Sequence, residues 1–204
     1  MNYHNITTDD MLNGEGLRTV LWVAGCGHAC PGCQNPVTWD ACGGLPFDEA
    51  AKAELFEKLG KPHISGITFT GGAPLYPANR EAATALAAEV RARFPKKTIW
   101  LYTGYTYEEI TKLPVLGFVD VLVDGRYDAA KRDVRLHWKG SSNQRVIDVP
   151  ATRAAGEIVL HDTDYGKEQT RCCALRDLRR FQRRSSACGI APASSGTAQP
   201  STGR

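Results

Sequence analysis

The sequence has no long hydrophobic run. No stretch of its 204 residues comes near the roughly 18 consecutive apolar residues of a membrane-spanning helix, so we expect no membrane segment. It also lacks a charged segment followed by an apolar one near its first residue, so we expect no secretory signal and a cytoplasmic location. Its seven cysteines are an odd number and three of them are crowded together, which argues against a disulfide framework and favours a reducing compartment.

The first 150 residues also have little net charge. They hold 16 lysines and arginines against 17 aspartates and glutamates, whereas residues 151–204 hold nine against five. A near-neutral domain lacks the basic surface that nucleic acids attract, so we expect no nucleic-acid binding. The change in charge predicts one folded domain over residues 1–150 and a basic, largely disordered extension over residues 151–204.

Three cysteines lie in one short segment. Cys26, Cys30 and Cys33 have the spacing Cys-x3-Cys-x2-Cys, which allows three thiols to converge on one inorganic centre. A structural zinc ion normally has four protein ligands, and a ferredoxin cluster also has four cysteines. Three thiolates on a cluster of four irons leave one iron open, where a substrate can bind. The alternative is a zinc site with Cys42 as the fourth ligand.

Two other side chains belong to the same part of the chain. His28 could ligate a metal, but we expect it to face solvent between Cys26 and Cys30. Trp39 follows the cysteines, and we interpret it as a packing residue that shields the centre.

Strands and helices alternate along most of the chain. Apolar runs predict strands over residues 17–23, 64–70, 98–103 and 118–123, with two further strand-like pieces over 134–138 and 145–149. Helical patterns predict helices over 46–59 and 78–94, and Thr106 with Glu109 forms a capping box for a short third helix. About five to six strands are too few for a closed eight-strand barrel. The predicted fold class is therefore α/β, an open partial (β/α) barrel of mostly parallel strands with flanking helices.

Glycines follow several of the predicted strands. Gly71 and Gly72 end the strand over residues 64–70, and two glycines at such a point let the backbone approach a ligand closely. A simple turn between a strand and a helix is the alternative. The cysteine loop, Thr103-Gly104 and Asp124-Gly125 also follow strands, and the carboxyl ends of parallel strands face one side. We therefore expect one site at that side.

The cysteine spacing after an apolar strand resembles the radical S-adenosylmethionine superfamily. Over roughly residues 1–150, a longer series of motifs resembles more closely the activating proteins of anaerobic ribonucleoside-triphosphate reductases, which are glycyl-radical enzyme activases. These motifs are Asn13-Gly14, Gly16-Leu17-Arg18-Thr19, Cys30-Pro31-Gly32-Cys33, Gly71-Gly72, Thr103-Gly104-Tyr105, Val123-Asp124-Gly125 and Gly140-Ser141-Ser142-Asn143-Gln144.

The resemblance implies two cofactors. One [4Fe-4S] cluster would be held by Cys26, Cys30 and Cys33, and S-adenosylmethionine would chelate its open iron. The implied contacts to S-adenosylmethionine are Gly32, Cys33, Gln34, Gly71, Gly72, Ala73, Thr103 and Asp124. Two positions depart from the family: Gln34 replaces a frequent aromatic residue, and Ala73 replaces a usual acidic residue. Loss of a charge-assisted hydrogen bond at Ala73 would weaken binding by about 1.5–3 kcal/mol, or roughly ten- to a hundredfold.

The resemblance also implies a reaction and partners. A low-potential electron donor such as flavodoxin would reduce the cluster, and S-adenosylmethionine would be cleaved to methionine and a 5′-deoxyadenosyl radical. The radical would take a hydrogen atom from one glycine of the large subunit of the anaerobic ribonucleoside-triphosphate reductase. Residues 140–144 are our candidate for part of the entrance for that glycine loop. Whether the chain forms a homodimer is left open.

Two other functions remain as alternatives. One is an activase of another glycyl-radical enzyme, of the formate-lyase type, although such proteins usually have longer chains and extra cysteine clusters. The other is a non-enzymatic iron–sulfur or zinc protein that binds a partner, which predicts no cleavage of S-adenosylmethionine.

The last part of the chain has a different composition. Residues 171–184 contain six arginines against one aspartate with apolar residues at helical spacing, which predicts a basic amphipathic helix. Residues 185–204 are rich in small and polar residues and are predicted to be disordered. We interpret this part as a solvated extension, with binding to an acidic surface or a nucleic acid as the alternative, and Cys172, Cys173 and Cys188 as free thiols.

Overall fold

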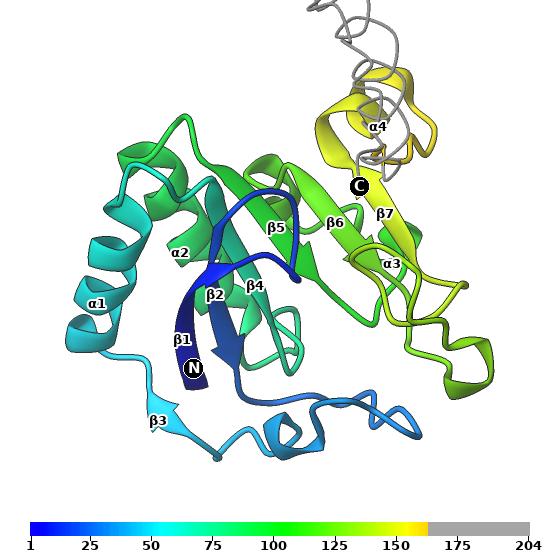
Figure 1. The fold of residues 1–204 in the computed structure, drawn as a ribbon, viewed down its shortest axis with the longest axis horizontal. Helices are drawn as coiled ribbons and strands as arrows, with labels where there is room; N and C mark the ends of the chain where they lie inside the picture. The colour runs from blue at the N-terminus through cyan, green and yellow to red at the C-terminus, as the bar shows by residue number, and fades with distance from the viewer. Residues whose placement is uncertain (163–204) are drawn as a thin grey trace, which may run out of the picture. The chain divides into compact units, whose positions relative to one another are not determined.

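One sheet of seven strands organises the protein. The computed structural model describes residues 1–162, and contacts divide the chain into a first unit, Met1–His161, and a second, Asp162–Arg204. The strand order in the sheet is β3-β1-β2-β4-β5-β6-β7 (Figure 1). The strands are β1 Asn2–Asp10, β2 Arg18–Val23, β3 Leu45–Pro46, β4 Gly66–Gly71, β5 Thr98–Tyr102, β6 Val121–Asp124 and β7 Arg145–Asp148.

The sheet is open and only partly parallel. Strands β2, β4, β5 and β6 run parallel to one another, as the sequence predicts. Strand β1 pairs antiparallel with β2 and β3, and β7 pairs antiparallel with β6. The architecture is therefore a mixed α/β fold around a central parallel core, and the expected mostly parallel barrel is corrected to this open mixed sheet.

The sequence prediction missed β1 because this strand is polar along most of its length. Only Tyr3 and Ile6 in it are buried. A strand near the edge of a sheet needs apolar residues on one face only, so its composition resembles a loop. The expected strand over 134–138 is also wrong. This segment is irregular, and Trp138 at its end has the left-handed φ of 56°.

Within residues 1–162, four helices accompany the strands: α1 Glu49–Gly60, α2 Arg80–Arg93, α3 Tyr107–Ile110 and α4 Val149–Ala155. The same residues form three 3₁₀ turns: η1 Pro36–Thr38 before α1, and η2 Pro114–Gly117 and η3 Ala129–Lys131 between α3 and α4. The side chain of Asp48 accepts a hydrogen bond from the Ala51 N–H at 2.9 Å, which fixes the start of α1. The predicted capping box of Thr106 and Glu109 is confirmed at the start of α3.

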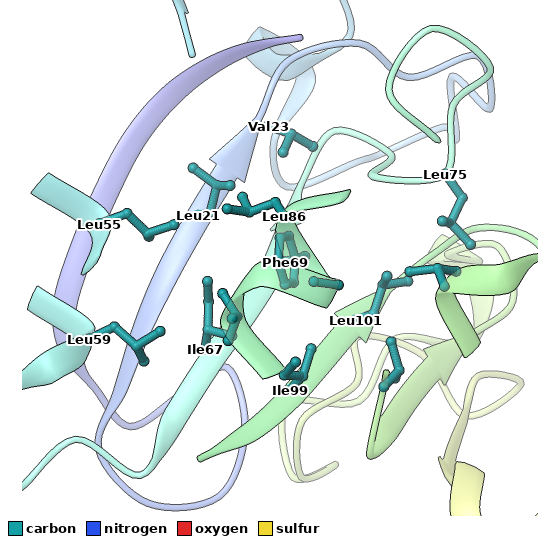
Figure 2. Close-up of a cluster of buried hydrophobic side chains, with 14 of the residues drawn as sticks. Leu21, Val23, Leu55, Leu59, Ile67, Phe69, Leu75, Leu86, Ile99 and Leu101 are labelled. Carbon is teal, nitrogen blue, oxygen red and sulfur yellow. The ribbon is translucent and has the colours of Figure 1, made fainter. Parts of the chain in front are cut away.

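The main core lies between the sheet and the helices α1 and α2. Figure 2 shows Leu55 and Leu59 of α1 and Leu86 of α2 against side chains from β2, β4 and β5, and Leu21 and Phe69 are both fully buried there. Apolar residues that alternate along these strands all point to this face, which is why the helices can cover it with an apolar stripe.

The opposite face of the sheet has a smaller core with a buried charge. Trp100 packs edge-on against Trp138, with ring centroids 5.0 Å apart. The Arg18 guanidinium lies 5.3 Å from the Trp100 ring, donates from Nε to Thr68 Oγ1 at 2.7 Å and from Nη2 to the Ile67 carbonyl at 2.6 Å. Burial lowers the pKa of Arg18 to about 10, so the group stays charged at neutral pH.

The first unit extends past the predicted boundary at residue 150. Helix α4 follows β7 directly and buries Val149 and Thr152, and Ile147 forms a bridge with Leu160. Among the described residues, no helix has the length and apolar character needed to cross a membrane. The predicted basic helix, the predicted disordered end and the cysteines at 172, 173 and 188 lie outside the described residues.

Candidate functional site

The cysteine loop leaves the carboxyl end of β2 (Figure 1). Backbone hydrogen bonds close this loop at its base. The Gly25 N–H donates to the Thr38 carbonyl at 2.8 Å, and the Cys26 N–H donates to the Trp39 carbonyl at 3.0 Å. Gly25 has a φ of 98°, a conformation that favours glycine. The intervening residues are thereby fixed as one loop over the end of the sheet.

The three predicted thiols lie on this loop and line a single pocket. Cys26, Cys30 and Cys33 are all free and half-buried. The Cys33 N–H donates to the Cys30 carbonyl at 3.1 Å, and Cys33 Sγ accepts a hydrogen bond from the Asn35 N–H at 3.4 Å. Burial raises the pKa of the Cys30 thiol, since a buried thiolate loses its hydration.

The same pocket collects residues from the carboxyl ends of β4, β5 and β6, as expected for parallel strands. Of the predicted contact residues, Cys33, Gln34, Gly71, Gly72 and Thr103 line it. It is further lined by residues that the sequence interpretation did not assign to a ligand: Asn13, His28, Asn35, Trp39, Thr70, Tyr102, Gly104, Gly125, Tyr127, Gly140 and Gln144.

Three predicted contact residues are not part of the pocket lining. Gly32 is exposed on the loop, with a φ of 70°. Ala73 is 1% exposed, and its N–H donates to the Gly25 carbonyl at 2.8 Å. These two positions, and Asp124, stay predictions as ligand contacts.

Asp124 has protein partners for its buried carboxylate. It accepts a hydrogen bond from the Tyr107 N–H at 2.7 Å and another from Arg145 Nε at 3.0 Å. Arg145 also pairs with Glu108, and this pair lowers the pKa of Glu108 to about 2. These contacts among Asp124, Arg145 and Glu108 connect the end of β6, the start of α3 and the start of β7.

Gly71 and Gly72 have a structural reason to be glycine that needs no ligand. A Cβ at Gly71, whose φ is 97°, would lie 2.9 Å from the Val23 nitrogen, and a Cβ at Gly72 would lie 2.7 Å from the Gly25 carbonyl oxygen. Contacts this short are not tolerated against backbone atoms. The turn therefore packs directly against the base of the cysteine loop, and its backbone also lines the pocket.

Two polar side chains fix the backbone around the pocket: Asn79, which the sequence interpretation missed, and Gln144, which it placed at the expected entrance. Asn79 is 2% exposed, and its Nδ2 donates to the Ala24 carbonyl at 2.7 Å, which joins the start of α2 to the base of the cysteine loop. Gln144 Nε2 donates to the Gly125 carbonyl at 3.0 Å, and its Oε1 accepts from the Gly140 N–H at 2.9 Å. Gln144 could be predicted to lie near the site because it belongs to the Gly-Ser-Ser-Asn-Gln motif. Asn79 could not, because a single asparagine before a helix belongs to no such motif.

His28 does not face solvent as expected. Its ring packs edge-on against Tyr105, with centroids 4.6 Å apart, and its Nε2 is buried. Burial, together with the nearby positive charge of Arg126, lowers the pKa of His28 and favours the neutral ring. The cysteine loop thus contacts the turn that follows β5.

The donor set fits an iron–sulfur cluster. Within residues 1–162, no three His, Cys, Asp or Glu side chains converge on a point where one metal ion could bind. Cys42 is exposed and does not line the pocket. In an iron–sulfur cluster each thiolate binds a different iron, so the sulfurs need not meet at one point. Three half-buried thiols in one pocket, one of them hydrogen-bonded to a backbone N–H, suit such a group.

Fold and pocket together define a class: an α/β protein with a three-cysteine loop at the carboxyl edge of a parallel sheet core. Residues 12–147 match a family model described as a 4Fe-4S single cluster domain, which supports an iron–sulfur cluster. The anaerobic ribonucleoside-triphosphate reductase-activating protein of Enterobacteria phage T4 is 49% identical over 146 residues, which cover 72% of this chain and 93% of that protein.

Bacterial proteins with the same name are also similar. Those of Pasteurella multocida (strain Pm70) and Escherichia coli (strain K12) are each 41% identical over 150 residues. The alignments cover 71% and 72% of this chain, and 95% and 97% of the relatives. The resemblance noted in the sequence is confirmed: the chain belongs to the family of anaerobic ribonucleoside-triphosphate reductase-activating proteins.

Proposed function

We propose that this protein generates a glycyl radical on the anaerobic ribonucleoside-triphosphate reductase, using a [4Fe-4S] cluster and S-adenosylmethionine in the pocket described above. The observation that carries the proposal is the meeting of three free thiols and the ends of three parallel strands in one pocket. When bound, the two groups would supply a carbon-centred radical able to remove a hydrogen atom from a glycine.

The chain's own residues would hold the cluster at one side of the pocket. Cys26, Cys30 and Cys33 would each bind one iron, and the fourth iron would stay open to S-adenosylmethionine. The Asn35 N–H already points at Cys33 Sγ, and a hydrogen bond of this kind stabilises a thiolate. Trp39 lines the same pocket and would limit the access of water.

Other groups that line the pocket would orient S-adenosylmethionine. The backbone of Gly71 and Gly72, the Thr103 side chain and Gln34 are the lining groups that can hydrogen-bond its amino and carboxylate groups. Ala73 offers no carboxylate to the ammonium group, so this turn would act through backbone carbonyls. Asp124 would act indirectly, because its carboxylate already binds Arg145 and Tyr107.

The proposed partners follow from the family. The large subunit of the reductase would present a glycine loop at the mouth of the pocket, where Gly140 and Gln144 line the wall. A low-potential electron donor such as flavodoxin would deliver the electron. An electron is required because the sulfonium must take up one electron when its carbon–sulfur bond breaks: two electrons then remain on sulfur as the lone pair of methionine, and one remains on the carbon radical.

The test is formation of the radical on the partner. The reconstituted protein, the reductase large subunit, S-adenosylmethionine and a reductant are mixed without oxygen, and glycyl radical is counted by EPR spectroscopy. We expect a radical signal with the wild type and none with Cys30→Ala. A formate-lyase-type enzyme activated in place of the reductase would support the first alternative function. Tight binding of zinc, with no cluster and no radical, would support the second.

A further inference from the structure

We propose that His28 is a positioning residue that holds the cysteine loop against the turn after β5. Gly104 in this turn provides the space that the His28 ring occupies. His28 lies at the centre of the segment between Cys26 and Cys30. Gly104 follows β5, far along the chain. This inference uses one part of the proposed function, namely that the cysteine loop binds an iron–sulfur cluster.

The absence of a side chain at Gly104 makes room for the imidazole. A Cβ built at this position would lie 2.4 Å from His28 Cδ2, 2.7 Å from Nε2 and 2.8 Å from Cγ. All three atoms belong to the ring, so the ring as a whole occupies the space that a larger residue would fill. The φ of Gly104 is outside the left-handed range, so alanine is compatible with the backbone there and only the contact opposes it.

The imidazole also contacts an aromatic ring. Tyr105 packs edge-on against His28 with centroids 4.6 Å apart and planes inclined at 71°. Tyr105 is itself fixed by the Arg80 guanidinium, 5.3 Å from its ring, and its N–H donates to Thr103 Oγ1 at 3.2 Å. His28 therefore contacts two consecutive residues of one turn.

Packing explains this contact better than hydrogen bonding does. Nε2 of His28 is buried and has no hydrogen-bond partner among residues 1–162. A ring packed against Gly104 and Tyr105 fixes the middle of the loop, while the hydrogen bonds of Gly25 and Cys26 fix its base. The consequence for function is that Cys26 and Cys30 keep their places before a cluster binds, which preorganises the site.

The experiment compares cluster retention in the full-length chain. The wild type, His28→Ala, Gly104→Ala and the double variant are reconstituted with iron and sulfide, and iron loss to a chelator is timed. Edge-to-face pairs of this kind predict roughly threefold to tenfold faster loss for His28→Ala. Gly104→Ala expels the same ring, so it should give a similar rate, and the double variant should be no faster than the single ones.

Two further variants separate the ring from its surroundings. His28→Phe keeps an aromatic ring without nitrogen atoms and should retain the cluster nearly as well as the wild type. Gly117→Ala is the matched control, because a Cβ there meets no atom within 4 Å and its iron loss should be unchanged.

The reduction potential gives a second readout, independent of turnover. A loosened loop admits water, and water stabilises the more negative reduced cluster, so the potential of His28→Ala should become less negative. Two outcomes would overturn this inference and leave the proposed function standing. One is a rate of iron loss in the double variant equal to the combined effects of His28→Ala and Gly104→Ala. The other is a His28→Ala protein that retains its cluster and has the same reduction potential as the wild type. A wild-type chain that binds no cluster would overturn the proposed function and this inference together.

Discussion

The two faces of the sheet differ in what they bury. The helix-covered face buries a large cluster of apolar side chains, which includes Leu21 and Phe69. The opposite face buries the Arg18 guanidinium among Thr68, Trp100 and backbone carbonyls, and it leads to the pocket at the carboxyl edge. One face thus supplies most of the stability, and the other keeps polar groups close to the site at a cost in stability.

Cys30→Ser should have the largest effect on the site and the smallest on the core. We expect it to abolish cleavage of S-adenosylmethionine and to leave the fold unchanged. Serine is nearly isosteric with cysteine, and Cys30 is only half-buried, so the free energy of unfolding without the cluster should change by less than about 1 kcal/mol. Loss of one thiolate should remove the cluster and reduce cleavage of S-adenosylmethionine to background. Iron analysis and denaturant unfolding of the cluster-free protein measure the two effects. Substantial iron and cleavage in this variant would contradict the assignment.

Phe69→Ala should have the opposite profile. This side chain is fully buried in the helix-covered core, and its truncation should lower the free energy of unfolding by about 3–5 kcal/mol. Denaturant unfolding measures the loss, and the folded fraction should still bind the cluster. If the free energy of unfolding falls by less than about 1 kcal/mol, Phe69 is not part of the main core.

Arg18→Ala tests the polar interior of the other face. Without the guanidinium, the Ile67 and Thr98 carbonyls and Thr68 Oγ1 lose donors in a buried place, so we expect a loss of about 3 kcal/mol. Arg18→Met fills more of the space and separates the lost volume from the lost hydrogen bonds. The account fails here if both variants unfold like the wild type.

The smallest effect concerns pH and the pair of Glu108 with Arg145. The folded pKa of Glu108 is lowered to about 2, so the stabilisation is present above its unfolded pKa of about 4.5 and is lost as pH falls toward 2. Glu108 is largely exposed, so solvent limits its contribution to under about 1 kcal/mol. Glu108→Gln should therefore flatten the loss of stability between about pH 5 and pH 2, with Glu81→Gln as a surface control. Parallel acid unfolding curves for wild type and Glu108→Gln would contradict it.

The sequence predicts the parallel centre of the fold because each strand there is a short segment rich in apolar and β-branched residues. It also predicts the cysteine loop, because the spacing of the three cysteines can be recognised without any knowledge of the fold. The sequence does not reveal strand β1, since only Tyr3 and Ile6 are buried in it. Its apolar residues over 134–138 predict a strand, but they belong to a loop in which Val134 is exposed and Trp138 packs on Trp100. The partners of Asn79 and His28 lie far along the chain, and no local pattern encodes such contacts.

The most direct test of the central claim is anaerobic cleavage of S-adenosylmethionine by the reconstituted, reduced protein. The account predicts 5′-deoxyadenosine and methionine in equal amounts, and neither product with Cys30→Ala. A cluster that forms without any cleavage, even after Ala73→Asp supplies the missing carboxylate, would contradict it.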